Sequence, residues 1–392
     1  TAHGAYALRE NTTAKFNTAV GACSLYANTT GANNIGVGYQ ALKNNTTACN
    51  NTAVGTQSML YTQTGNHNTA IGKSSLQNNS TGGQNTASGY RALLSNTTGS
   101  NNTGSGFYSL KTNTTGALNT ASGAYSLKSN TTAGGNTAFG TKTLQANTTG
   151  AGNTASGYGA LCANTTGALN TASGQFSMRG NSTGTENTAS GYQALCTNTT
   201  ASFNTAFGSR ALRVNTTGAC NDAVGWCALT TNTTGGYNTA MGLWSLKLNT
   251  TGSKNASVGS HSLQSNTTGC FNTTIGYQSL QANTTAHYNT AVGGCTLFAN
   301  TTGCRNTAVG FKALVANTCG RDNTAVGNNA GYSNTTGCWM TASGKYALFC
   351  NTSGCNNVAM GGSSLCKNTS GCHNTAVGHY SLAANTTSLR NV

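Results

Sequence analysis

The feature that most constrains this chain is a 17-residue period that runs from end to end without an insertion or deletion. Counted from the asparagine of each Asn-Thr-Ala-x-Gly segment as position 0, the unit reads N-T-A-x-G-x-x-[AS]-L-x-x-N-T-T-G-x-x. Position 4 is glycine in all 23 copies, from Gly4 to Gly378. Met340 alone replaces asparagine at position 0, and Thr62 alone replaces it at position 11. Such self-similarity indicates a repeat architecture in which each unit stacks on its neighbours.

The length of the period selects the fold class. A helical repeat needs about 33 residues and a propeller blade about 40, so this unit is too short for either. Its residues favour turns over helices, and no apolar i, i+3, i+4 pattern is sustained. We predict an all-β, parallel β-solenoid with about 23 coils, each built from two or three short strands joined by glycine turns. Residues 1–392 are expected to form a single continuous repeat domain, as a window of a longer array.

Variation between copies predicts which side chains point inward. Positions 0, 2, 4, 7, 8, 11, 13 and 14 are nearly constant, whereas positions 5, 6, 9, 10, 15 and 16 vary freely. Positions 0, 2 and 4 alternate with 1 and 3, as in a strand with one buried face. The predicted core contains one large apolar group per coil, the leucine at position 8. Glycines at positions 4 and 14 are expected to adopt positive φ at corners, where a Cβ would clash.

Asparagines fill much of the remaining core, and buried amides are stable there only when they are hydrogen-bonded. Stacked coils place equivalent asparagines above one another, so each amide can donate to the carbonyl of the next. We predict two such ladders, one at position 0 formed by Asn17, Asn34, Asn51 and their successors, and one at position 11 formed by Asn28, Asn45 and Asn79. The threonines at position 13 are expected to stack similarly. At about 1 kcal/mol for each net hydrogen bond, the ladders should matter as much as the leucine column.

The runs NTAVG (residues 51–55) and NTASGYQAL (residues 187–195) resemble the Asn-Thr-Ala-x-Gly repeats of bacterial and phage surface fibres. That resemblance implies a tail-fibre-like or adhesin-like shaft at the cell or virion surface, often a homotrimer, with any receptor-binding tip elsewhere. The repeat is also similar, more loosely, to the head repeats of trimeric autotransporter adhesins. Its Asn-x-[Val/Ala]-x-Gly spacing resembles the ice-binding solenoids of grasses.

The scarcity of acidic residues argues against an enzyme. Charged residues make up only 6% of the chain, and the four acidic ones are far apart in the sequence: Glu10, Glu186, Asp222 and Asp322. They offer no carboxylate pair, and no catalytic triad, P-loop or dinucleotide fingerprint is present. We therefore expect no catalytic activity, no cofactor and no metal site. No apolar run approaches the roughly 20 residues of a membrane span.

Basic residues give the chain a net charge of +15, and seven of them share position 9: Arg9, Lys43, Lys111, Lys128, Arg179, Arg213 and Lys247. This stripe on the outer wall would attract anionic polysaccharide, lipid head groups or nucleic acid, or it simply solvates a nearly uncharged surface, which is the interpretation we favour. Outer aromatic residues such as Tyr39 and Tyr108 would stack on sugars or pack against neighbouring chains. The expected partners are further copies of this chain and surface polysaccharide, and not nucleic acid.

The chain has 15 cysteines, six of them at position 15. Cys338, Cys355 and Cys372 lie on consecutive coils, where their Cα atoms would be about 5 Å apart, within disulfide range. Pairs within one coil, Cys350–Cys355 or Cys366–Cys372, are alternatives. Secretion would favour crosslinking. An odd number leaves at least one thiol free or joined to another chain.

Glycosylation motifs recur with the same period. All but two copies carry an Asn-x-Ser/Thr sequon at position 11, which predicts either a dense N-glycan coat or the buried ladder. We favour the ladder, because glycans about 4.8 Å apart would crowd. Outward threonines at positions 1 and 12, such as Thr18 and Thr29, are candidates for O-glycans. The same columns permit an ice-binding face, although position 3 beside them varies from Ser88 to Phe139.

Together these patterns predict a structural extracellular fibre or filament. It would assemble as a homotrimer or as an end-to-end filament. The alternatives are an adhesin or phage tail-fibre shaft with its tip elsewhere, and an ice-binding solenoid.

Overall fold

The computed structural model describes residues 1–392 and confirms the parallel β-solenoid. Each 17-residue repeat forms one coil, and no helix is present. Each coil contains a single short strand at positions 1–3, where the sequence predicted two or three; turns and bends form the other walls. The chain divides into two compact units, residues 1–200 and 201–392. That residues 1–392 form one continuous domain stays a prediction.

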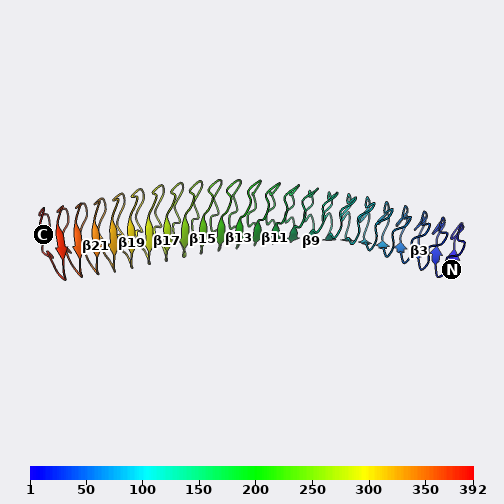
Figure 1. Ribbon diagram of the computed structural model, residues 1–392, viewed down its shortest axis with the longest axis horizontal. Helices are drawn as coiled ribbons and strands as arrows, with labels where there is room; N and C mark the ends of the chain where they lie inside the picture. Colours follow the sequence, from blue (N-terminus) through cyan, green and yellow to red (C-terminus); the bar gives the residue numbers. More distant parts are fainter. The chain divides into compact units, whose positions relative to one another are not determined.

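Unit 1 carries strands β1 to β12, and consecutive strands pair in parallel. Every pairing joins residues that occupy the same repeat position, as in Thr52 with Thr69 and Ala53 with Ala70. Figure 1 shows these strands as arrows along one wall. Their bounds are Ala2–His3, Thr18–Val20, Ile35–Val37, Thr52–Val54, Thr69–Ile71, Thr86–Ser88, Thr103–Ser105, Thr120–Ser122, Thr137–Phe139, Thr154–Ser156, Thr171–Ser173 and Thr188–Ser190.

Unit 2 carries strands β13 to β23 with the same in-register parallel pairing, as in Thr290 with Thr307 and Val292 with Val309. A repeat of constant length dictates this register, because any other offset would expose the buried alanine at position 2. The strand bounds are Thr205–Phe207, Asp222–Val224, Thr239–Met241, Ala256–Val258, Thr273–Ile275, Thr290–Val292, Thr307–Val309, Thr324–Val326, Thr341–Ser343, Val358–Met360 and Thr375–Val377.

The turns depend on left-handed backbone at residues that are mostly not glycine. Positions 6, 8 and 16 have positive φ along the chain, as in Cys23 (56°), Leu25 (49°) and Asn33 (60°). A left-handed residue with a Cβ costs about 1–2 kcal/mol, whereas burying a leucine side chain yields about 1.5–3 kcal/mol. Leu25 is fully buried, so burial can offset the strain at position 8.

Backbone hydrogen bonds join the coils on the non-strand walls as well. The N–H of Leu25 donates to the carbonyl of Ala41 in the next coil at 2.9 Å, and that of Cys23 donates to Ala5 in the previous coil at 2.8 Å. Ala27 donates to Lys43 at 2.9 Å. The left-handed residues thus direct backbone N–H groups along the stack. The backbone on the walls without strands is therefore also hydrogen-bonded.

The core agrees with the prediction at positions 0, 2, 7, 8 and 11, whose side chains are buried through both units. The expectation for position 13 is wrong: Thr30 and Thr47 are exposed, because the chain turns outward there. Positive φ at position 14 is also wrong, since Gly31 has no left-handed backbone. A Cβ on Gly31 would instead press against the carbonyl of Ala48 and the Asn28 amide oxygen, so close approach explains this glycine.

Candidate functional site

The position-0 asparagines form a buried ladder within each unit, which in unit 2 is interrupted at Met340. The side-chain oxygen of Asn17 accepts the backbone N–H of Asn34 at 2.8 Å, and that of Asn34 accepts from Asn51 at 3.0 Å. In many coils the amide nitrogen also donates along the column, as from Asn68 to Asn51 at 3.2 Å. The predicted ladder is confirmed, with the backbone N–H as its most regular donor.

The position-11 asparagines form the second ladder, in which amide bonds directly to amide. The Asn45 amide nitrogen donates to the Asn28 oxygen at 2.7 Å, and the Asn96 nitrogen donates to Asn79 at 2.8 Å. These side chains have no exposed surface. The sequons at position 11 are therefore inside the solenoid, where their amide nitrogens are occupied as hydrogen-bond donors.

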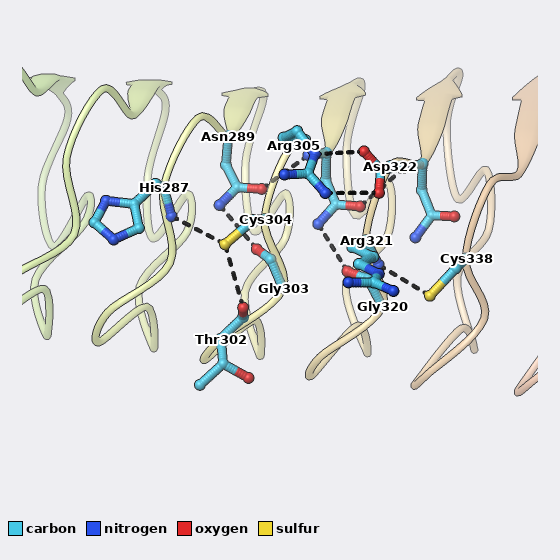
Figure 2. A network of polar contacts seen from close by, with 12 residues as sticks. His287, Asn289, Thr302, Gly303, Cys304, Arg305, Gly320, Arg321, Asp322 and Cys338 are labelled. Carbon is cyan, nitrogen blue, oxygen red and sulfur yellow. Dashed lines mark hydrogen bonds and ion pairs between the residues drawn. The ribbon is translucent and has the colours of Figure 1, made fainter.

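A carbonyl at position 14 connects the two ladders within each coil. The Gly31 oxygen accepts from Asn17 at 2.8 Å and from Asn28 at 3.0 Å. The same arrangement recurs in unit 2, where the Asn289 amide donates to the Gly303 carbonyl at 2.9 Å (Figure 2). Because this carbonyl lies between both columns, the ladders brace one coil internally as well as joining neighbouring coils.

The position-11 ladder is interrupted at Thr62. This threonine is buried, its hydroxyl has no hydrogen-bond partner, and neither does the side-chain oxygen of Asn45 in the preceding coil. Asn79 in the following coil still donates to the Gly82 carbonyl at 2.8 Å. One substitution therefore leaves two buried polar atoms unsatisfied.

Threonine at position 12 adds a third column. The Thr29 hydroxyl donates to the Thr46 carbonyl of the next coil at 3.0 Å, and Thr97 donates to Thr114 at 3.1 Å. Thr29 and Thr18, the two O-glycan candidates, are both half-buried. They differ in bonding, because Thr29 uses its hydroxyl in the coil-to-coil contact, whereas Thr18 lies on the outer face of β2 beside the exposed Val20.

Cys338, Cys355 and Cys372 are free thiols, so the disulfide expected among them is wrong. The sulfurs of Cys355 and Cys372 each accept the backbone N–H of the preceding column member, at 3.2 and 3.1 Å. In-register stacking separates equivalent Cβ atoms by about 4.8 Å, beyond the roughly 3.5–4.5 Å of a disulfide. Figure 2 shows Cys304 and Cys338 in this accepting role. Cys350 and Cys366, from the alternative pairings, are also free.

The outer wall pairs basic residues at position 9 with aromatic residues at position 6 of the same coil. The Lys111 ammonium lies 4.7 Å from the ring centroid of Tyr108, and Lys247 lies 4.3 Å from that of Trp244. Arg9, Lys128 and Arg179 make the same contact with the residue three positions before them. Such pairs contribute about 0.5–1 kcal/mol at exposed sites. The sequence shows these basic residues three positions after aromatic ones, but it does not show that the two side chains are in contact.

One exposed ion pair bridges two coils of unit 2. The Arg305 guanidinium donates to both carboxylate oxygens of Asp322, at 2.6 and 3.1 Å (Figure 2). The hydrogen bonds from Arg305, with its positive charge, lower the pKa of Asp322.

Comparison with models of known protein families finds none that matches this chain, and comparison with curated proteins finds no significant relative. The structure contains no helix with the length and apolarity needed to span a bilayer. Its histidine, cysteine and acidic side chains nowhere gather in threes as metal ligands would.

Proposed function

We propose that the protein is a structural fibre outside the cell, a β-solenoid shaft braced by asparagine ladders. The observation that carries this proposal is the equivalence of the coils: most buried amides are satisfied by the coil before or after them. A stack of that kind extends by adding identical coils. Its stability is a sum of neighbour-to-neighbour terms, which suits a part with a mechanical role.

The resemblance of the repeat to bacterial and phage surface fibres supports an exterior location and self-association as a homotrimer or end-to-end filament. Exposed apolar side chains on the strand face, including Ile71, Phe139 and Met241, offer contacts between chains. An adhesin or tail-fibre shaft with a receptor-binding tip elsewhere is the second candidate, and the same resemblance favours it.

Immunogold electron microscopy of native material, with antibody raised against this chain, tests the proposal. We expect label along threads that project from cells or virions. Label confined to the cell interior would contradict it, and label restricted to short spikes would favour the adhesin shaft. Sedimentation of the purified chain, of 39.5 kDa, then separates a trimer from an open-ended filament.

Ice binding is disfavoured by the shape of the strand face. Side chains at position 3 alternate between small and large, from Ser122 to the exposed Phe139 on the next coil, and so roughen the surface beside the threonine column. Thermal hysteresis in a solution of the chain would reverse this judgement.

A further inference from the structure

A hollow of about 430 Å³ opens on the outer wall of unit 1, and we call it the Gly159 hollow. It spans three consecutive coils, from residue 142 to residue 180. Its volume falls within the range of about 300–1,000 Å³ that is typical of small-molecule sites. Its principal lining residues are Lys142, Tyr158, Gly159, Phe176, Arg179 and Gly180.

Two exceptional glycines line this hollow. Gly159 is the only glycine at position 6 among the 23 copies, and Gly180 is the only one at position 10. The backbone does not require glycine at position 6, since Gln193 adopts the same left-handed conformation there (φ 54°, against 65° at Gly159). A Cβ on Gly159 would lie 3.1 Å from the ring of Phe176. The absence of a side chain therefore lets the Phe176 ring lie close against the backbone of Gly159.

The exposed ring of Tyr158 provides an apolar platform, with Phe176 set nearly perpendicular beside it. Tyr158 and Phe176 meet edge to face, with their ring centroids 5.4 Å apart. Tyr158 remains 43% exposed, so its ring is accessible from solvent. The C–H face of a pyranose ring is apolar and flat, and it gains from contact with such rings in the way other apolar groups do.

Two cations flank the platform without a carboxylate partner. The Arg179 guanidinium lies 5.4 Å from the Phe176 ring centroid, and Lys142 lies on the coil before Gly159. Neither takes part in an ion pair. Burial raises the pKa of the Cys162 thiol in the same wall, although both cations lower it, so the thiol stays neutral near pH 7. An arginine with open donors is suited to bidentate recognition of a carboxylate.

We propose that the Gly159 hollow binds a uronic-acid residue of an acidic polysaccharide. The sugar ring lies on the exposed face of Tyr158, beside Phe176, and its carboxylate bonds to Arg179 and Lys142. A nucleic acid fits less well, because it needs cations that continue along the strand. Here the position-9 neighbours of Arg179 are Cys162 and Cys196, which are not basic residues.

A second hollow, of about 360 Å³ in unit 2, provides an internal comparison. Tyr346, Phe349, Cys350 and Cys366 line it, with Lys367 as its one cation. It offers aromatic surface with one lysine and no arginine, so it should favour a carboxylate less strongly than the Gly159 hollow does.

Isothermal titration calorimetry on the full chain tests the proposal with trigalacturonate as probe. Maltotriose, a neutral trimer with the same linkage type, and a thymidine decanucleotide serve as competitors. We expect one trigalacturonate site per chain, with at least tenfold weaker binding of both competitors. No measurable binding of trigalacturonate, equal affinity for maltotriose, or tighter binding of the oligonucleotide would each overturn the proposal.

Substitutions then locate the site. Arg179→Ala removes the carboxylate contact and Gly159→Gln fills the hollow with a residue that other coils carry at this position, so each should weaken binding at least tenfold. Lys43→Ala removes the same charge from position 9 of a coil without a hollow and should leave affinity unchanged. If Lys43→Ala and Arg179→Ala weakened binding equally, the interaction would be diffuse attraction to a basic surface. Binding by the single chain does not depend on fibre assembly. Calorimetry therefore tests this proposal, and the micrographs test the proposed function separately.

Discussion

Met340 packs against Gly331, and these two residues are paired departures from the repeat. The Met340 methyl group lies 3.9 Å from where a Cβ on Gly331 would be, and Met340 is buried. Gly331 is the only glycine at position 8, and Met340 is the only residue other than asparagine at position 0. The flexible thioether approaches the space that a leucine would otherwise occupy. The leucine side chain missing at Gly331 and the methionine side chain added at Met340 are therefore neighbours in the core.

Restoring the consensus at both sites should be less damaging than restoring it at Gly331 alone. Gly331→Leu should destabilise by about 1–3 kcal/mol, because its side chain would crowd Leu314 and the Met340 methyl group. Adding Met340→Asn makes room and supplies a side-chain acceptor for the Asn357 N–H. Urea denaturation of both single variants and the double variant should give a coupling energy of about 0.5–3 kcal/mol. Simple additivity would contradict the pairing.

Repairing the interrupted ladder should stabilise the chain. Thr62→Asn supplies a donor for the unsatisfied oxygen of Asn45 and replaces a buried hydroxyl that has no partner. We expect a gain of about 1–3 kcal/mol and slower amide exchange in the neighbouring coils. The matched control is Thr64→Asn, two residues away on the exposed surface, which should change neither. A neutral or destabilising Thr62→Asn would show that the amide does not complete the column.

The adjacent residues Asn79 and Asn78 allow a ladder asparagine to be compared with an outer one. Asn79 is buried and accepts from Asn96, whereas Asn78 is half-buried at a position where other coils carry alanine. Asn79→Ala should lower the free energy of unfolding by about 1–3 kcal/mol, because the Asn96 amide then keeps only the Gly99 carbonyl of its two acceptors. Asn78→Ala should change it by less than about 0.5 kcal/mol. The denaturant midpoints of the two variants measure these changes in stability. Equal losses of stability in both variants would refute a special role for the ladder.

The Arg305–Asp322 pair should show itself in a titration more clearly than in stability. Because the folded pKa of Asp322 is lowered, the pair stabilises the fold above the unfolded pKa of this carboxyl, and that contribution is lost as the pH falls through the folded value. Carbon-detected NMR should place the Asp322 midpoint below that of an ordinary aspartate. Arg305→Gln should move it upward, and an unchanged midpoint would exclude the contact in solution. Since Arg305 is exposed and Asp322 only half-buried, the effect should weaken in high salt.

Glycan mapping by mass spectrometry of native material should find no sugar on the position-11 asparagines, whose amides are buried and hydrogen-bonded. If O-glycans are present, we expect them on Thr18 and its equivalents in preference to Thr29. A sugar on Thr29 would remove the proton that bonds to Thr46. Occupied asparagines in this column would mean that the ladder does not form in the native protein.

The candidate sites were only partly predictable. The buried columns of Asn17 and Asn28 followed from invariance, because a buried amide needs an identical partner above and below it. The Gly159 hollow did not, although both of its glycines break the pattern at variable positions. Variation on an outer wall carries no signal until the coil geometry shows which positions from neighbouring coils meet. The cysteine column failed for a related reason, since Cα spacing alone does not give the direction of the Cβ atoms.

By itself, the sequence determined the period, the in-register stacking, the leucine column and the two ladders. In an unbroken repeat of constant length, each residue stacks only on the residue at the same repeat position. Buried polar side chains are then stable only where this stacking gives them hydrogen-bond partners. The tertiary structure decided that each coil has one strand, that Leu25 and its equivalents turn through left-handed backbone, and that Thr30 faces water. It also paired Gly331 with Met340. Those outcomes depend on backbone dihedral angles and on distances between coils, where strain and burial compete within a few kcal/mol.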